Sequence, residues 1–131
     1  MAVNWIAILL CGVSSLGLGA LWYAPFLFGR SWQRGVGLSD ETLSGGSMAT
    51  IFALAFLLSL AAAWAVSVLL GPDPELGPAV TIAGSVGLFC VATSFGISYS
   101  FERRSLSLWL INAGYHFVQF GLFGLILGLI G

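Results

Sequence analysis

The chain has 131 residues, of which 59% are hydrophobic and 7% are charged, and its mean hydropathy is +1.04. Soluble domains carry about 25% charged residues, so this composition excludes a water-soluble monomer. The length excludes a multidomain enzyme, and a net charge of −1 disfavours nucleic-acid binding, which needs a basic surface. We therefore expect a small integral membrane protein that forms a single domain over residues 1–131.

Four apolar stretches predict four membrane-spanning helices. They cover residues 3–23, 48–70, 79–99 and 106–130. Each is close to the ~20 residues that a helix needs to cross a hydrocarbon layer ~30 Å thick. Helices are expected because hydrocarbon leaves an open strand edge unpaired, and barrel strands would be shorter and would alternate in polarity. The first stretch lacks basic residues at its start, which disfavours a cleaved signal peptide.

The positive charges of the chain are distributed unevenly among the loops. The first loop (residues 24–47) and the third (residues 100–105) hold two arginines each, whereas the proline-rich second loop (residues 71–78) holds two acids and no base. Positively charged loops remain in the cytoplasm. The predicted fold is therefore an all-α membrane protein of two hairpins, with both termini outside. The arginines are Arg30, Arg34, Arg103 and Arg104.

The first loop is long for a connection and predicts a short helix on the inner surface of the membrane. Pro25 suits the first position of a helix. The residues that follow mix bulky apolar side chains with two arginines, a pattern typical of interfacial helices. Ser39 and the two acids after it predict a further helical turn. Gly45 and Gly46 are expected to end that turn before the second span.

Polar residues form one stripe on the fourth predicted span. At 100° per residue, Asn112, His116 and Gln119 share a face, with Tyr115 at its edge. Asn4 and Ser15 belong to a similar stripe on the first span. His116 is the side chain whose reference pKa of ~6.5 lies nearest neutrality. The stripe predicts either a hydrated pathway or hydrogen bonds between neighbouring helices, and the sequence leaves both open.

Glycines occupy the opposite face of the same span. Gly114, Gly121 and Gly128 share this face, and Gly124 forms a GxxxG pair with Gly128. Such residues let helix backbones approach closely, and Gly12 and Gly19 offer the same in the first span. A single bundle does not need both a polar and a glycine face on one helix. We therefore expect a homo-oligomer in which one of the two faces meets a second subunit.

The third loop combines one acid with two arginines. Glu102, Arg103 and Arg104 at the inner mouth suggest a gate, a lipid-phosphate clamp or a partner site. They also fit simple anchoring with one surface ion pair worth ~0–1 kcal/mol. Arg30 and Arg34 are spaced to bind anionic lipid, which again serves anchoring. Tyrosines and tryptophans near the same boundary, such as Tyr23, Tyr99 and Trp109, are expected to be interfacial anchors.

The sequence carries no recognisable catalytic chemistry. It contains no nucleophile–base motif, phosphate loop or zinc motif. Cys11 and Cys90 lie in apolar stretches and are interpreted as small packing residues. One histidine and one cysteine supply too few ligands for a metal ion. We therefore expect no catalytic residue, metal or cofactor. The spans also lack charged residues in their middle, which disfavours an energised transporter.

Two sequence blocks resemble a known family. They cover residues 19–32 and 101–116, and Asn4 with Trp5 adds to them. Together they resemble the bacterial membrane family DUF1761, over nearly the whole chain. The resemblance implies a four-helix, multi-pass protein of the bacterial inner membrane and brings no known activity. The residues that match the family pattern are Trp22, Tyr23, Pro25, Gly29, Trp32, Glu102, Arg103, Asn112, Gly114, Tyr115 and His116.

Two function hypotheses follow. The first is a homo-oligomeric passive channel or facilitator for a small solute or ion, lined by Asn112, His116 and Gln119 with Ser15 and Asn4 opposite. The second is a structural or accessory membrane protein that organises lipid or a partner complex through its first and third loops. The expected partners are membrane lipids and a second copy of the chain. A membrane enzyme ranks third, because it would need a cofactor or metal that no residue pattern indicates.

Overall fold

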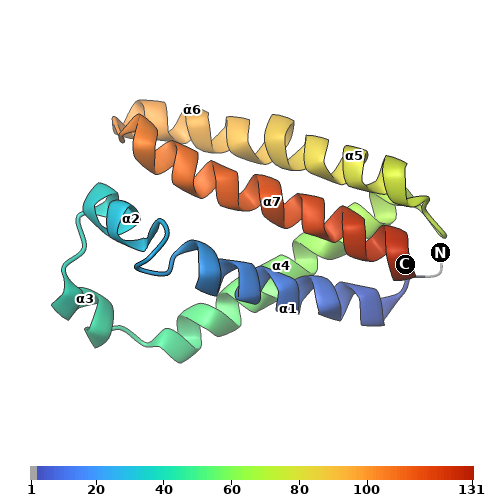
Figure 1. Cartoon of the computed structure of the whole chain (residues 1–131), viewed down its shortest axis with the longest axis horizontal. Helices are drawn as coiled ribbons and strands as arrows, with labels where there is room; N and C mark the ends of the chain where they lie inside the picture. Colours follow the sequence, from blue (N-terminus) through green and yellow to red (C-terminus); the bar gives the residue numbers. More distant parts are fainter. Residues whose placement is uncertain (1–2) are drawn as a thin grey trace.

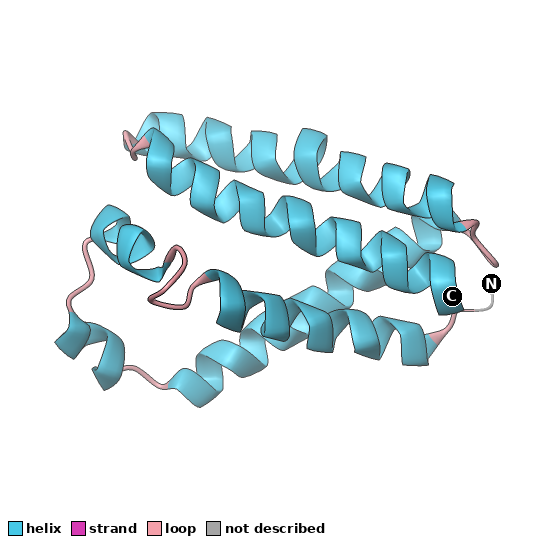
Figure 2. Cartoon of the chain, viewed as in Figure 1, coloured by secondary structure: helices cyan, strands magenta, loops and turns pink. Residues whose placement is uncertain are grey.

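The computed structural model describes residues 3–131 and consists of helices joined by short loops (Figures 1 and 2). Four helices are long and apolar enough to cross a membrane, and this part of the chain contains no strand. The four predicted helical spans are thus confirmed. The second and fourth have the predicted bounds, and the first and third differ by a few residues at their ends. The spans are Trp5–Trp22, Met48–Leu70, Leu76–Glu102 and Leu106–Ile130.

The third span is not a uniform α-helix. It contains α5 (Leu76–Val86), the π-helix η1 (Gly87–Ala92) and α6 (Thr93–Glu102). The apolar pattern gave no sign of this wider turn. The π-helix lies where the span touches the last helix, α7 (Leu106–Ile130): a Cβ on Gly87 would lie 3.1 Å from a backbone oxygen of that helix. π-Helical turns occur mostly as single bulges inside α-helices, as here.

Helix α7 is the centre of the bundle. It packs against α1 (Trp5–Trp22), α4 (Met48–Leu70) and all three parts of the third span, while α1 crosses α4 (Figure 1). Small side chains in the core let the helices approach closely. The core cluster contains Ala7, Ile8, Cys11, Ala63, Val66, Ala83, Phe120, Phe123 and Leu127. Large apolar side chains such as Leu57, Leu58 and Phe89 are more than 60% exposed, which suits a surface covered by lipid.

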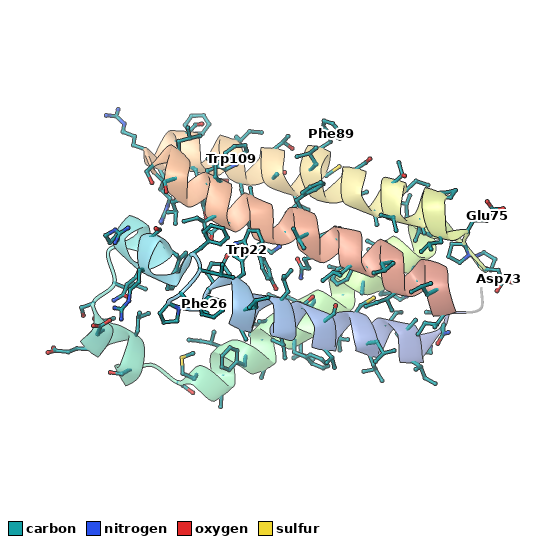
Figure 3. The ribbon with its side chains drawn as sticks, viewed as in Figure 1. Trp22, Phe26, Asp73, Glu75, Phe89 and Trp109 are labelled. Carbon is teal, nitrogen blue, oxygen red and sulfur yellow. The ribbon has the colours of Figure 1, made fainter. Side chains whose placement is uncertain are left out.

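The two ends of the bundle differ in charge. The first-loop helices and the α6–α7 connection lie at one end, while the start of α1, the C-terminus and the α4–α5 connection lie at the other (Figure 1). The first end carries all four arginines and is called the arginine end below. Asp73 and Glu75 lie at the opposite end (Figure 3). The arrangement of the chain therefore separates the arginines from Asp73 and Glu75, as the loop pattern predicts, while Asp40, Glu41 and Glu102 lie with the arginines.

The first loop contains two short helices, α2 (Gly29–Val36) and α3 (Asp40–Gly45). The predicted turn after Ser39 is confirmed, since the hydroxyl of Ser39 accepts a hydrogen bond from the backbone of Thr42 at 3.1 Å. The prediction that Pro25 begins a helix is wrong. Residues 23–28 form a turn that folds back on α1, and the helix begins at Gly29.

The reason for this turn is the end of α1. The last carbonyls of a helix have no partner within it. Here the backbone nitrogen of Phe28 donates to the oxygen of Trp22 at 3.1 Å, and that of Ala24 donates to the oxygen of Leu21 at 3.2 Å. A Cβ on Gly29 would collide with the backbone oxygen of Tyr23. Capping α1 therefore takes precedence over starting a helix at the proline.

Candidate functional site

The first part of the candidate site is a set of polar side chains around Gln119, which is 4% exposed. The amide nitrogen of Gln119 donates to the hydroxyl of Ser15 on α1 at 2.9 Å and to that of Ser59 on α4 at 3.4 Å. Its amide oxygen pairs with Nδ1 of His116 at 2.6 Å. Because the amide oxygen only accepts, Nδ1 carries the hydrogen in this arrangement. One side chain thus connects three helices.

The second part lies closer to the arginine end and is centred on Asn112. The hydroxyl of Tyr23 donates to the amide oxygen of Asn112 at 2.7 Å, and the amide nitrogen donates to the hydroxyl of Tyr99 at 2.8 Å. Burial and the neighbouring phenols of Tyr115 and Tyr99 raise the pKa of Tyr23, which lies just beyond α1, so it remains a neutral donor. The cluster joins the end of α1 to α6 and α7.

Aromatic rings fill the space between the two parts. The hydroxyl of Tyr115 donates to the backbone oxygen of Ser15 at 2.8 Å. The ring of His116 meets Tyr115 and Phe95 edge to face, with centroids 4.9 Å and 5.0 Å away. Tyr23 packs on Tyr115 with centroids 5.6 Å apart. Side chains therefore occupy the region that links the two clusters. Below, the two clusters and these rings are called the polar network.

Two tryptophans add hydrogen bonds to backbone carbonyls across helices. The indole of Trp22 donates to Ile111, and that of Trp109 donates to Ala92 in the π-helix, both at 2.9 Å. Both indoles lie between helices (Figure 3). Glycines make room for them: a Cβ on Gly114 would lie 3.0 Å from Trp22, and one on Gly96 would lie 3.1 Å from Trp109. The sequence predicts Trp109 only as an interfacial anchor. Gly96 on the preceding span, which leaves room for the indole, is the sequence feature that could have indicated a contact between the two helices.

Most residues of the predicted stripe meet in the polar network, but Asn4 does not. Its amide nitrogen donates to the backbone oxygen of Ile130 at 2.6 Å, and its amide oxygen accepts from the backbone of Ala7 at 3.1 Å. Asn4 caps α1 at the end opposite the arginines. At ~1.5 Å per residue it lies roughly 16 Å from Ser15, although both share a helical face.

The third span contributes little to this network beyond Tyr99 and Phe95. Cys90, Thr93 and Ser94 are exposed. The hydroxyls of Thr93 and Ser94 donate to carbonyls of their own span, at 2.7 Å to Phe89 and 2.5 Å to Cys90. Cys11 is buried in the core, but the interpretation of Cys90 as a packing residue is wrong. Periodicity alone did not show which face of this span meets α7.

Every buried polar atom of the described side chains has a partner. In residues 3–131, no buried side-chain nitrogen or oxygen lacks a hydrogen bond. Two surface hollows lie along the seams between α7 and the third span, and the second of them includes Tyr99 of the polar network. One, of about 540 Å³, lies between α5 and α7 and includes Gly84 and Gly121. The other, of about 530 Å³, lies between α6 and α7 at the arginine end.

The glycine face of α7 is mostly used within the chain. A Cβ on Gly124 would lie 2.5 Å from the backbone oxygen of Ala79, and one on Gly128 would lie 2.8 Å from the Cα of Leu76. Gly114 meets Trp22, Gly19 meets Tyr115, and Gly12 meets Phe56 and Leu60. Only Gly121, of the residues on this face, has open space around it. Most of the glycine face is therefore used by contacts within the chain, and Gly121 is the part of it that the other helices leave open.

The charged residues of the arginine end are exposed and partly paired. The Nε of Arg104 donates to Glu102 at 2.7 Å, and its guanidinium lies 5.4 Å above the ring of Tyr99. This hydrogen bond raises the pKa of Arg104. Arg30 lies 3.9 Å from Asp40. Arg34 donates to Ser31, and Arg103 adopts a left-handed conformation with φ 58° in the α6–α7 turn.

In residues 3–131, no three His, Cys, Asp or Glu side chains form a cluster that could hold a metal ion.

Comparison with known proteins assigns the chain to a family. A family model described as "Protein of unknown function (DUF1761)" matches residues 6–128, which include nearly all of the four spans and the whole polar network. No curated protein and no solved structure matches the chain. The chain therefore belongs to the DUF1761 family, a family whose function is unassigned.

Proposed function

We propose that the chain is a non-enzymatic accessory protein of the bacterial inner membrane that organises lipid through its arginine end. One observation carries this proposal: the polar groups within the bundle bind one another across helices. Gln119 uses both its amide nitrogen and its amide oxygen on neighbours from α1, α4 and α7. A polar stripe paired in this way supports a structural core.

The alternative function is a passive channel or facilitator for a small solute or ion. A water-filled pathway needs polar groups that face water along its length. In the polar network the described buried polar atoms are paired, and the rings of Phe95 and Tyr115 pack against His116. The geometry of one chain therefore supports the accessory role more than conduction.

The proposed orientation places the arginine end in the cytoplasm and both termini outside. Its support is the distribution of charge: four arginines lie at one end, and Asp73 and Glu75 lie at the other. Basic loops remain on the cytoplasmic side during insertion. At that surface the arginines meet the anionic leaflet, where each contributes roughly 1 kcal/mol of attraction.

A homo-oligomer remains part of the proposal, through the part of the glycine face around Gly121 that the chain leaves open. The hollow between α5 and α7 brings Gly84 and Gly121 together on the outside of the bundle. No atom within 4 Å would obstruct a Cβ on Gly121. A second copy that packs here would approach these glycines without disturbing the core.

Reconstitution into liposomes tests the proposed function. Purified protein in vesicles is assayed for flux of protons, K⁺, Na⁺, Cl⁻, glycerol and urea, with His116→Ala and Ser94→Ala as variants. We expect no flux above that of protein-free vesicles for any of the three proteins. Flux that rises with the amount of protein, and that His116→Ala changes while Ser94→Ala does not, would establish the channel and overturn the accessory role.

A further inference from the structure

The hollow between α6 and α7 has two different ends, and it is called the seam trough below. It opens on the outside of the bundle at the arginine end and has a volume of about 530 Å³. Its polar end is formed by Ser100, Arg104 and Ser105, and its apolar part by Gly96, Ile97 and Trp109. This division matches an amphiphile whose charged group lies at the membrane surface and whose chain enters the hydrocarbon.

The polar end carries donors that have no acceptor within residues 3–131. Glu102 binds the Nε of Arg104, so this bond leaves both terminal nitrogens of the guanidinium for another acceptor. The hydroxyl oxygen of Ser105 accepts from the backbone of Leu108 at 3.1 Å, so its own hydrogen is still available. Arg103 adds a second positive charge beside one acid, which makes the turn favourable for an anion.

The apolar part is shaped by contacts already described. The bond from Trp109 to Ala92 holds the indole in the seam, and Gly96 leaves room for it. Ile97 is 63% exposed and also lines the trough. The residues of α6 that line the trough run from Ser100 to Thr93, roughly 10 Å of helix at ~1.5 Å per residue. That length fits within one leaflet, which is half of a ~30 Å hydrocarbon layer.

We propose that the seam trough binds one anionic phospholipid of the cytoplasmic leaflet. Its phosphate lies at Arg104 and Ser105, and one acyl chain lies along Ile97 and Trp109. An anionic lipid is favoured over a zwitterionic one because the turn carries a net positive charge, and its one acid, Glu102, is already paired with Arg104. This inference rests on the proposed function and specifies the lipid class that the arginine end organises.

Native mass spectrometry of lipids retained through purification tests this site. The protein is extracted from vesicles of equal parts phosphatidylglycerol and phosphatidylcholine, and the retained lipids are counted. We expect one phosphatidylglycerol per chain, favoured about fivefold over phosphatidylcholine, which is the effect of one basic residue at an anionic surface. Arg104→Gln removes this preference. Arg34→Gln changes the charge of the same end by the same amount outside the trough, and keeps it.

A second variant and a competition complete the test. Ile97→Trp fills the apolar part, leaves the Glu102–Arg104 pair intact, and is expected to lose the retained lipid even if Arg104→Gln does not fold. Inorganic phosphate at 10 mM is expected not to displace the lipid. Equal retention of the two lipids by the wild type, equal losses in Arg104→Gln and Arg34→Gln, full retention in Ile97→Trp, or displacement by phosphate would each overturn the site. None of these outcomes bears on the flux assay, so the two proposals fail separately.

Discussion

The amide nitrogen of Gln119 donates to the hydroxyl of Ser15 at 2.9 Å, across 104 residues of the chain. The same amide group reaches Ser59 on a third helix and His116 on its own helix. In membrane proteins such bonds contribute ~0.6 kcal/mol each on average. Leaving the partners of a buried group without a bond costs more, ~1–3 kcal/mol. Gln119 therefore stabilises the relative positions of α1, α4 and α7.

Replacing Gln119 tests this role. Gln119→Leu keeps the approximate volume and removes all three hydrogen bonds, so we expect a loss of about 1–3 kcal/mol in the free energy of unfolding. Unfolding by SDS in mixed micelles, followed by circular dichroism, measures it. Ser94→Ala removes an exposed hydroxyl that bonds only within its span, and is expected to change the free energy by less than ~0.5 kcal/mol. Equal stability of Gln119→Leu and wild type would show that the network is not structural.

Two glycines on α7 give a matched comparison of packing. Gly124→Ala places a methyl group 2.5 Å from the backbone oxygen of Ala79, which cannot move without displacing α5. We expect a destabilisation of about 1–3 kcal/mol from overpacking. Gly121→Ala meets no atom of its own chain within 4 Å, so in monomeric protein it is expected to be neutral or to stabilise by up to ~1 kcal/mol, because alanine favours the helix. The same unfolding assay ranks the two variants, and the reverse order would contradict this packing of α5 on α7.

Trp109, like Trp22, contributes a hydrogen bond between helices, and this contribution can be measured at Trp109. Trp109→Phe keeps an aromatic ring in the seam but leaves the carbonyl of Ala92, a buried residue, without the indole donor. We expect a loss of ~1 kcal/mol or more in the free energy of unfolding. Trp64→Phe is the control, since Trp64 is 46% exposed and has no cross-helix bond in the described part of the chain. If both variants lose the same amount, the bond to Ala92 does not stabilise the bundle.

The raised pKa of Tyr23 predicts a loss of stability in alkali. A phenol whose pKa is higher in the folded state holds its proton more tightly there. The contribution of Tyr23 to the free energy of unfolding is fully present below the ordinary phenol pKa of ~10. It is lost as the pH rises above that pKa, because only the unfolded chain then releases the proton. We expect the wild type to lose more stability between pH 8 and pH 11 than Tyr23→Phe does. Identical losses would show that Tyr23 is not the group responsible.

Reporter fusions test the proposed orientation. Alkaline phosphatase folds only outside the cytoplasm, whereas green fluorescent protein exported through the general secretion route does not fluoresce there. We expect a C-terminal phosphatase fusion to be active and a C-terminal fluorescent fusion to be dark, because the arginines hold the opposite end inside. Replacing all four arginines by glutamine is expected to weaken this difference. An inactive phosphatase fusion and a bright fluorescent fusion would place the C-terminus in the cytoplasm.

The sequence predicted those features that depend on the composition of a continuous stretch. The second and fourth spans have their predicted bounds because Ser47 and Ser105 cap the helices directly before long apolar runs. The turn after Ser39 has the same explanation. The separation of the arginines from Asp73 and Glu75 follows from the number of spans alone. The predicted helix start at Pro25 is wrong because the turn there depends on backbone bonds to α1. A residue pattern read along one segment does not show such bonds.

The sequence by itself determined the helical fold, the number of spans and the charge of each end, because hydrocarbon requires every spanning backbone to bond within itself. Only the tertiary structure decided what the polar stripe of α7 does. Periodicity places Asn112, His116 and Gln119 on one face, but it does not show whether that face meets water or Ser15. The packing of α1 and α4 on that face brings their polar groups within bonding distance, since a buried polar group needs a partner when water is absent.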